Sequence, residues 1–174
     1  MNIVLMGYRG SGKTTIGRKI ADELWKDFVD TDAVVCQRMG GRTIREIWDI
    51  DGEAAFRAAE SDVVVEALSK ENQVIALGGG SPMQPVARQA IAEARDAVKI
   101  YLKCDPEVLF RRIEADTASS ATRPALSAAG GSLEEVRRLL AEREPVYESL
   151  ADKVFDVTHV TTADAVGHII RRCL

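Results

Sequence analysis

The segment Gly7-Tyr8-Arg9-Gly10-Ser11-Gly12-Lys13-Thr14 fits the pattern GxxxxGK[ST] at every fixed position. It follows a strand-like run, residues 3–6. It precedes a stretch in which apolar residues recur at every fourth position, as expected for one face of a helix. A strand, a glycine-rich loop and a helix in this order form the context in which the pattern binds nucleotide phosphates.

The physics of this loop predicts which groups hold the phosphates. Glycines let the backbone turn its N–H groups inward, and the following helix adds the partial positive charge of its N-terminus. We expect Lys13 to neutralise the β- and γ-phosphates and the Thr14 hydroxyl to reach Mg²⁺. The expected ATP-binding residues of the loop are Gly10, Ser11, Gly12, Lys13, Thr14 and Thr15. The pattern alone does not distinguish a kinase from an ATPase or a GTPase.

Strand-like and helix-like segments alternate along the rest of the chain. This alternation predicts an α/β fold with a parallel sheet, helices on both faces and ligands beyond the carboxyl ends of the strands. The expected strands are residues 3–6, 28–29, 74–77, 98–102 and 154–157. Thr43-x-x-Glu46 and Ser132-x-x-Glu135 are typical of helix starts, as is Asp105-Pro106.

Composition narrows the class of protein. The chain has 174 residues, a size that suits one domain, with 46% apolar and 29% charged residues, as in soluble globular proteins. The net charge of −4 offers no general attraction for nucleic acid or anionic membrane, so an anionic substrate needs local arginines. The three cysteines include no CxxC pair, and we see neither a secretory signal nor a spanning apolar run. We therefore expect a cytoplasmic protein.

A pair of aspartates, Asp30 and Asp32, ends the second expected strand. Strand alternation would aim both carboxylates the same way, and like charges this close need a cation or a hydroxyl group between them. In the functional interpretation, Asp30 helps to hold Mg²⁺, and Asp32 accepts a hydrogen bond from a substrate hydroxyl and takes its proton. In the structural interpretation, Asp32 caps the next helix. Both stay open on this motif alone.

Arginines and glycines supply candidates for an acid-binding site. Arg57 and Glu60 share a helix face, where they form either a solvated ion pair worth ~0.2–0.5 kcal/mol or an oriented clamp for a substrate carboxylate. The triple glycine 78–80 follows the third strand and permits close backbone approach to a ligand. Arg143, which we expect near a helix end, is a second candidate for the carboxylate. Residues 115–131 read as a lid, and its Arg123 would reach the transferring phosphoryl group on closure.

In this order, the motifs resemble those of the shikimate kinase family over essentially the whole chain. They are the loop 7–14, Asp30-Thr31-Asp32, Asp51-Gly52-Glu53 leading into Phe56-Arg57-x-x-Glu60, the glycines 78–80, Arg123-Pro124, and Arg143-x-Pro145-x-Tyr147. The resemblance implies a three-layer P-loop kinase fold with a five-stranded parallel sheet, forming one domain over 1–174. Its substrate region would lie at about 32–60 and its lid at about 113–131. It also implies ATP and Mg²⁺, with phosphorylation of the shikimate 3-hydroxyl in aromatic amino-acid biosynthesis, and no partner beyond these small molecules. We expect a monomer.

The resemblance also assigns roles to individual residues. Lys13 and Arg123 would contact phosphate, Thr14 and Asp30 would serve Mg²⁺, and Arg112 would stack on adenine. Arg57 and Arg143 would clamp the carboxylate, while Asp32 and the backbone of Gly79 and Gly80 would bind hydroxyl groups. The catalytic set would be Asp32, Lys13 and Arg123.

Two departures concern the lid and the adenine contacts. The lid reads Arg123-Pro124-Ala125-Leu126 where the family often has a second leucine, and it is longer than usual; the adenine loop is placed only roughly, near 159–162. Two other functions are weighed against this one. A kinase of another small polyol, such as gluconate, would lack the second substrate arginine. A nucleotide-binding module without catalysis would lack Asp32 or the lid arginine.

Overall fold

Five parallel strands form one sheet in the order β2-β3-β1-β4-β5. The computed structural model describes residues 1–116 and 132–172. All five expected strands are present, with ends within one residue of those expected. The bounds are β1 Asn2–Met6, β2 Asp27–Asp30, β3 Gln73–Ala76, β4 Ala97–Lys103 and β5 Lys153–Asp156.

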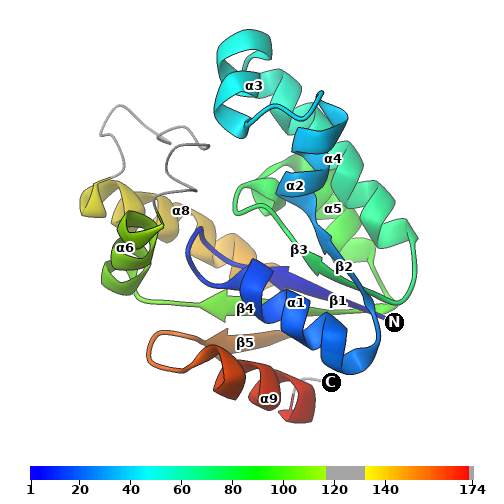
Figure 1. The fold of residues 1–174 in the computed structure, drawn as a ribbon, viewed down its shortest axis with the longest axis vertical. Coiled ribbons are helices and arrows are strands. Elements are labelled where there is room, and N and C mark those ends of the chain that lie inside the picture. Colours follow the sequence, from blue (N-terminus) through cyan, green and yellow to red (C-terminus); the bar gives the residue numbers. More distant parts are fainter. Residues whose placement is uncertain (117–131, 173–174) are drawn as a thin grey trace.

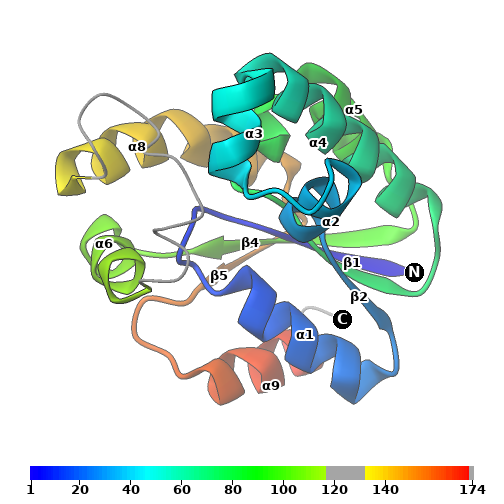
Figure 2. The same cartoon turned by 45° about the horizontal axis from the view of Figure 1, so that its top comes forward.

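Helices cover both faces of this sheet, which confirms the three-layer fold (Figures 1 and 2). Helices α1 (Lys13–Leu24) and α9 (Thr162–Arg172) lie on one face. Helices α4 (Glu53–Ser69), α5 (Pro85–Glu93) and the C-terminal part of α8 (Leu133–Leu150) lie on the other, and α6 (Pro106–Ala115) packs against α8.

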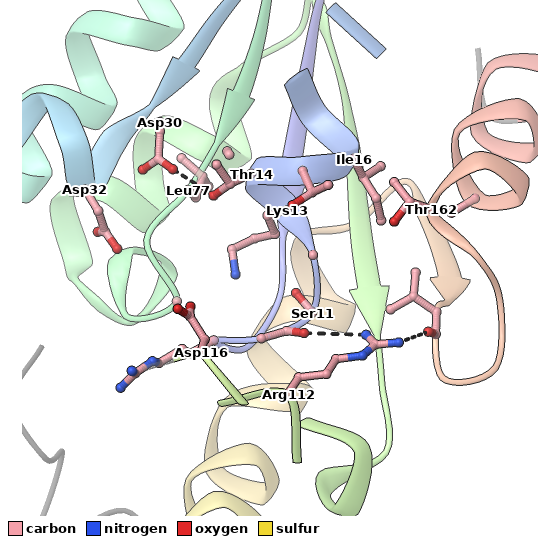
Figure 3. Close-up of a pocket in the computed structure, with 18 of the residues that line it drawn as sticks. Ser11, Lys13, Thr14, Ile16, Asp30, Asp32, Leu77, Arg112, Asp116 and Thr162 are labelled. Atoms are coloured by element: carbon pink, nitrogen blue, oxygen red, sulfur yellow. Dashed lines mark hydrogen bonds between the residues drawn. The ribbon is translucent and has the colours of Figure 1, made fainter. Parts of the chain in front are cut away.

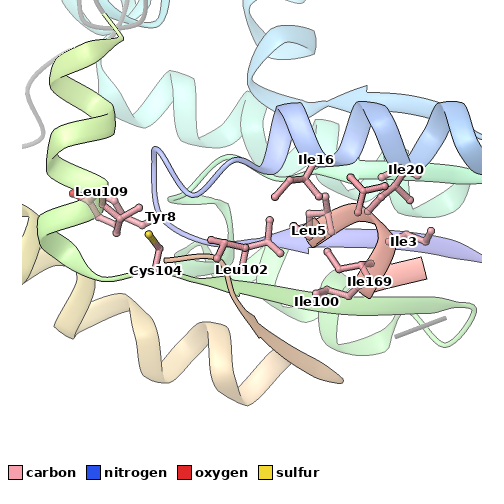
Figure 4. Packing of buried hydrophobic residues seen from close by; sticks show 14 of the residues in the cluster. Ile3, Leu5, Tyr8, Ile16, Ile20, Ile100, Leu102, Cys104, Leu109 and Ile169 are labelled. Atoms are coloured by element: carbon pink, nitrogen blue, oxygen red, sulfur yellow. The ribbon is translucent and has the colours of Figure 1, made fainter. Parts of the chain in front are cut away.

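The alternation of side chains along β1 explains how the central strand holds both layers. Ile3 and Leu5 are fully buried in the cluster that contains Ile16, Ile20 and Ile169 of α1 and α9 (Figure 4). Val4 and Met6 point to the opposite face, into the cluster with residues of α4, α5 and α8. Burial of both faces is why β1 is an unbroken apolar run. The loop that follows β1 therefore starts from a strand that is buried on both faces.

A helical outgrowth after β2 adds a second, smaller core. It consists of α2 (Thr31–Arg38), α3 (Ile44–Asp51) and the first half of α4, packed around Val35, Ile47 and Phe56. Thr43 and Glu46 form the expected reciprocal capping box at the start of α3. Figure 1 shows α3 at the far end of this outgrowth, beyond the carboxyl edge of the sheet. It carries one wall of the second pocket described below.

Two helix expectations need correction. Asp32 does not cap α2: the cap is Asp30, whose Oδ1 accepts a hydrogen bond from the Ala33 N–H at 3.3 Å. Arg143 does not lie near a helix end, because α8 continues through Pro145 to Leu150. A proline inside a helix removes one backbone hydrogen bond, but the packing of Leu139, Leu140 and Tyr147 on the core holds α8 together past it. Within the described residues, no helix is long and apolar enough to cross a membrane.

Candidate active site

The loop between β1 and α1 lines a cavity of about 410 Å³ at the carboxyl edge of the sheet (Figure 3). All six expected ATP-binding residues of the loop, 10–15, border it. Gly10 and Gly12 have φ of +84° and +91°, which L side chains rarely adopt, so these two glycines permit the turn. Asp30, Asp32 and Gly79 border the same cavity from the neighbouring strand ends.

Lys13 and Ser11 present polar groups that suit an anion. The Lys13 ammonium donates hydrogen bonds to the carbonyls of Gly7 and Tyr8, at 2.8 and 2.9 Å, and extends into the cavity (Figure 3). The Ser11 hydroxyl is buried and finds no hydrogen-bond partner in the part of the chain that the structure describes. A buried hydroxyl without a partner is costly unless a ligand completes it.

Two oxygen-bearing side chains of a kind that suits a divalent cation lie at one wall of this cavity. The Thr14 hydroxyl donates to Asp30 Oδ2 at 2.7 Å, although the two residues are 16 positions apart. A hydroxyl and a carboxylate are hard oxygen donors of the kind that Mg²⁺ prefers, and Mg²⁺ usually keeps waters and phosphate oxygens as its other ligands. No cluster of three or more His, Cys, Asp or Glu residues able to hold a metal occurs in the described ranges. The two residues therefore fit a cation shared with phosphates better than an all-protein site.

Arg112 closes the opposite wall of the cavity. Its guanidinium donates to the carbonyl of Val157, at 2.9 Å, and to that of Gly10, at 3.4 Å (Figure 3). It thus joins the phosphate loop to the segment after β5. That segment, through Val160, Thr161 and Thr162, borders the cavity where we expected the adenine loop.

A second, smaller pocket of about 60 Å³ adjoins the first. Its lining combines three apolar side chains, Ile44, Trp48 and Phe56, with charged residues and glycines, which are Arg9, Asp32, Arg57, Glu60, Gly79, Gly80 and Arg143. Arg9, Asp32 and Gly79 border both pockets. Asp32 therefore stands where a group in the second pocket meets a ligand in the first.

The Arg57–Glu60 pair lies largely out of solvent, so the interpretation as a solvated surface ion pair is wrong. Arg57 Nη1 lies 2.8 Å from Glu60 Oε2, and the Glu60 side chain is only 1% exposed. Burial raises the pKa of Glu60, and the nearby charge of Asp32 adds to this rise, whereas Arg57 and Ser81 oppose it. A buried carboxylate restricts the orientation of the guanidinium that it contacts. Glu60 therefore helps to orient Arg57, which lines the pocket.

The glycine turn after β3 lies directly against these charged groups. A Cβ atom on Gly78 would lie 2.3 Å from Asp32 Oδ1 and 2.6 Å from Glu60 Oε1. A Cβ atom on Gly80 would lie 2.5 Å from Arg57 Nη1. Because these glycines have no side chains, the carboxylates of Asp32 on α2 and Glu60 on α4 can lie directly against the turn.

Arg143 approaches the second pocket from α8. Its guanidinium carbon lies 5.5 Å from the centre of the Tyr8 ring, a cation–π contact. Arg143 and Arg57 thus reach one pocket from two helices that are far apart in sequence. Arg123 and the rest of the expected lid, apart from residues 113–116, lie outside the described residues.

Some residues of the site were given no role by the sequence. Arg9 occupies a variable position of the phosphate loop, yet it borders both pockets. Trp48 lies in the expected substrate region, and its ring lies 5.5 Å from the Arg57 guanidinium carbon. Ser81 and Tyr147 make hydrogen bonds across 21 and 68 positions, and no local spacing could reveal these.

Comparisons with known proteins show which family this chain resembles. The family profile described as "Shikimate kinase" matches residues 9–174. A shikimate kinase of Caldanaerobacter subterraneus subsp. tengcongensis is 38% identical over 98% of this chain and 94% of its own length. The structure of shikimate kinase from Acinetobacter baumannii in complex with shikimate covers 98% of this chain and 90% of its own, with a TM-score of 0.88 and 30% identity. A gluconokinase from Sinorhizobium meliloti, covering 99% of this chain and 93% of its own, has a TM-score of 0.58 and 19% identity, and shares the fold alone.

Proposed function

The chain belongs to the shikimate kinase family, and we propose that its two joined pockets carry out that family's reaction. The enzyme transfers the γ-phosphoryl group of ATP to the 3-hydroxyl of shikimate, giving shikimate 3-phosphate and ADP for aromatic amino-acid biosynthesis. One observation carries this proposal. The cavity lined by the phosphate loop and the pocket lined by Arg57 and Arg143 meet at a single carboxylate, Asp32.

In the first pocket, residues 10–15 hold the triphosphate. Backbone N–H groups of the loop and the N-terminus of α1 face the phosphates, and Lys13 exchanges its two carbonyl partners for phosphate oxygens. Arg112 borders the adenine side of this pocket and stacks on the base. Arg123 completes the phosphate contacts from the lid.

Thr14 and Asp30 would hold Mg²⁺ between them. When bound, the cation neutralises negative charge on the phosphate oxygens. Asp30 has a second task, because its other oxygen caps α2. The cap fixes the direction of the carboxylate and keeps its free oxygen directed at Thr14.

In the second pocket, shikimate lies between the two arginines and Asp32. Arg57 and Arg143 pair with its carboxylate, and planar guanidinium groups suit this bidentate contact. The backbone of Gly79 and Gly80 binds its hydroxyl groups. The side chains of Trp48 and Phe56, which line the same pocket, pack on the ring. The Acinetobacter baumannii structure, which holds shikimate, supports this choice of ligand.

The chemical step needs little covalent work from the protein. The 3-hydroxyl oxygen forms a bond to the γ-phosphorus as the bond from that phosphorus to the bridging β-oxygen breaks. The hydroxyl proton passes to Asp32, and ADP leaves with the electron pair of the broken bond. Alignment of the two substrates and neutralisation of charge supply most of the rate.

We also propose that residues 1–174 act as one functional unit and that the enzyme is a monomer. Residues 32–60 form its substrate region, and residues 113–131 form its lid. Cys104 is a buried thiol outside any disulfide. A reduced thiol suits a reducing compartment and supports the expectation of a cytoplasmic enzyme.

An ADP-release assay with several acceptors tests the function. ATP and Mg²⁺ are mixed with shikimate, gluconate, another small polyol or no acceptor. Among these acceptors, we expect only shikimate to give rapid release of ADP. Gluconate lacks the ring that fits between Trp48 and Asp32. Equal release with gluconate would indicate a polyol kinase of wider range, and equal release without acceptor would indicate an ATPase.

A further inference from the structure

Side-chain hydroxyl groups join the glycine turn to both helices that carry the pocket arginines. Ser81, directly after the turn, donates a hydrogen bond from Oγ to Glu60 Oε1 on α4 at 2.7 Å. Tyr147 on α8 donates from its hydroxyl to the carbonyl oxygen of Gly79 at 2.5 Å. Ser81 and Tyr147 are both fully buried.

On α4, the link through Ser81 reaches Arg57 in two steps. The Glu60 oxygen that does not face Ser81 accepts the hydrogen bond from Arg57 Nη1 at 2.8 Å. Glu60 is buried, so it has few alternative positions once Ser81 and Arg57 are in place. The position of the Arg57 guanidinium is therefore set by contacts that lead back to the glycine turn.

On α8, Tyr147 lies one helical turn after Arg143. Burial raises the pKa of Tyr147, while the charge of Arg143 and its hydrogen bond to the Tyr147 side chain lower it. Pro145 lies between the two residues and removes a backbone hydrogen bond from this part of the helix. The hydrogen bond from Tyr147 to Gly79 ties the helix to the glycine turn two residues after this proline.

We propose that Ser81 and Tyr147 are positioning residues that set the spacing of Arg57 and Arg143 for the substrate carboxylate. This inference rests on the proposed function. Both helices that carry the arginines are hydrogen-bonded to the glycine turn, α4 through Ser81 and α8 through Tyr147. The turn therefore fixes the positions of the two helices relative to each other. Correct spacing matters because bidentate recognition of a carboxylate is geometrically strict.

The test compares Ser81→Ala and Tyr147→Phe with matched controls. Ser61→Ala also removes a buried serine hydroxyl from this region, but that hydroxyl donates to the Arg57 carbonyl within α4. Tyr101→Phe removes the hydroxyl of the tyrosine that packs on Tyr147, with ring centres 5.1 Å apart, and that hydroxyl contacts Glu144. Neither control residue lines the first or the second pocket described above.

Steady-state kinetics with shikimate, ATP and the methyl ester of shikimate provide the readout. We expect each test variant to raise the KM for shikimate about tenfold, the scale of one misplaced charge-assisted contact. The KM for ATP should stay within about twofold, as should kcat/KM for the ester, which has no carboxylate charge for the arginines to clamp.

The outcomes separate this inference from the proposed function. Wild-type turnover of shikimate supports the function whatever the variants do. The positioning role is overturned if either variant keeps its KM for shikimate within twofold of its control. It is also overturned if shikimate and the ester lose activity equally, because a general loss of structure would then explain the effect.

Discussion

A methyl group on Gly78 tests whether the close packing of two carboxylates on the glycine turn sets the geometry of the reaction. Cβ contacts under 3.0 Å essentially never occur, yet this methyl would lie 2.3 Å from Asp32 Oδ1, 2.6 Å from Glu60 Oε1 and 2.9 Å from Ser81 Oγ. The Asp32 oxygen must therefore withdraw by at least 0.7 Å and the Glu60 oxygen by at least 0.4 Å.

A shift of this size has a calculable consequence for catalysis. Misplacement of a reacting group by ~1 Å costs about 100-fold in rate, or ~2.7 kcal/mol of transition-state stabilisation. We therefore expect Gly78→Ala to lower kcat/KM for shikimate by about 100-fold while the KM for ATP changes little. The fold should survive, because alanine is allowed at the φ of Gly78 and its N–H still reaches Thr31 Oγ1.

The assay is ADP release at varied shikimate and varied ATP, with thermal unfolding measured in parallel. Gly167→Ala on α9 is the control, because its added methyl would meet only the flexible end of Arg171, at 3.1 Å. If folded Gly78→Ala enzyme keeps kcat/KM for shikimate within threefold of wild type, the placement of Asp32 by this turn is refuted.

The remaining predictions concern three charged residues of the second pocket. Arg57→Ala should raise the KM for shikimate by about 10- to 100-fold, because it removes ~1.5–3 kcal/mol of charge-assisted hydrogen bonding. The KM for ATP should not change. Equal changes in both KM values would argue against a carboxylate clamp. Asp32→Asn should lower kcat by about 10²- to 10⁴-fold with ATP binding, measured by calorimetry, close to wild type; normal turnover would exclude Asp32 as the base. Glu60→Gln should change the pH dependence of stability. Because burial raises the pKa of Glu60 above 4.5, its contribution to folding is present below pH 4.5 and is lost as the pH rises above it. The unfolding free energy of wild type, relative to Glu60→Gln in urea titrations, should fall over that range; a constant difference would contradict the raised pKa.

The sequence predicted the sheet and the phosphate loop because both depend on local patterns. Apolar runs bounded by turns located each strand, and the loop pattern placed Lys13 and Thr14 at the end of β1. Asp30 and Asp32 do border one cavity, but not for the reason expected. The strand ends at Asp30, so strand alternation does not relate the two side chains; the cap at Asp30 and the first turn of α2 do.

Long-range contacts explain what the sequence did not show. The burial of Glu60 depends on α4, the glycine turn and Ser81 meeting in space, and an i, i+3 spacing alone reads equally well as a surface pair. Arg143 was expected near a helix end, but α8 continues through Pro145 to Leu150 because its side chains pack on the core. Arg9 lines both pockets because the fold brings the phosphate loop beside α3 and α4, and no local pattern in the sequence indicates this.

The most direct measurement of the central claim is a crystal structure of the enzyme with shikimate and ADP. The account predicts the shikimate carboxylate within hydrogen-bond distance of the guanidinium groups of both Arg57 and Arg143, with the 3-hydroxyl on Asp32 and directed at the phosphate loop. A structure in which the carboxylate contacts neither arginine, or in which the 3-hydroxyl points away from Asp32, would contradict it.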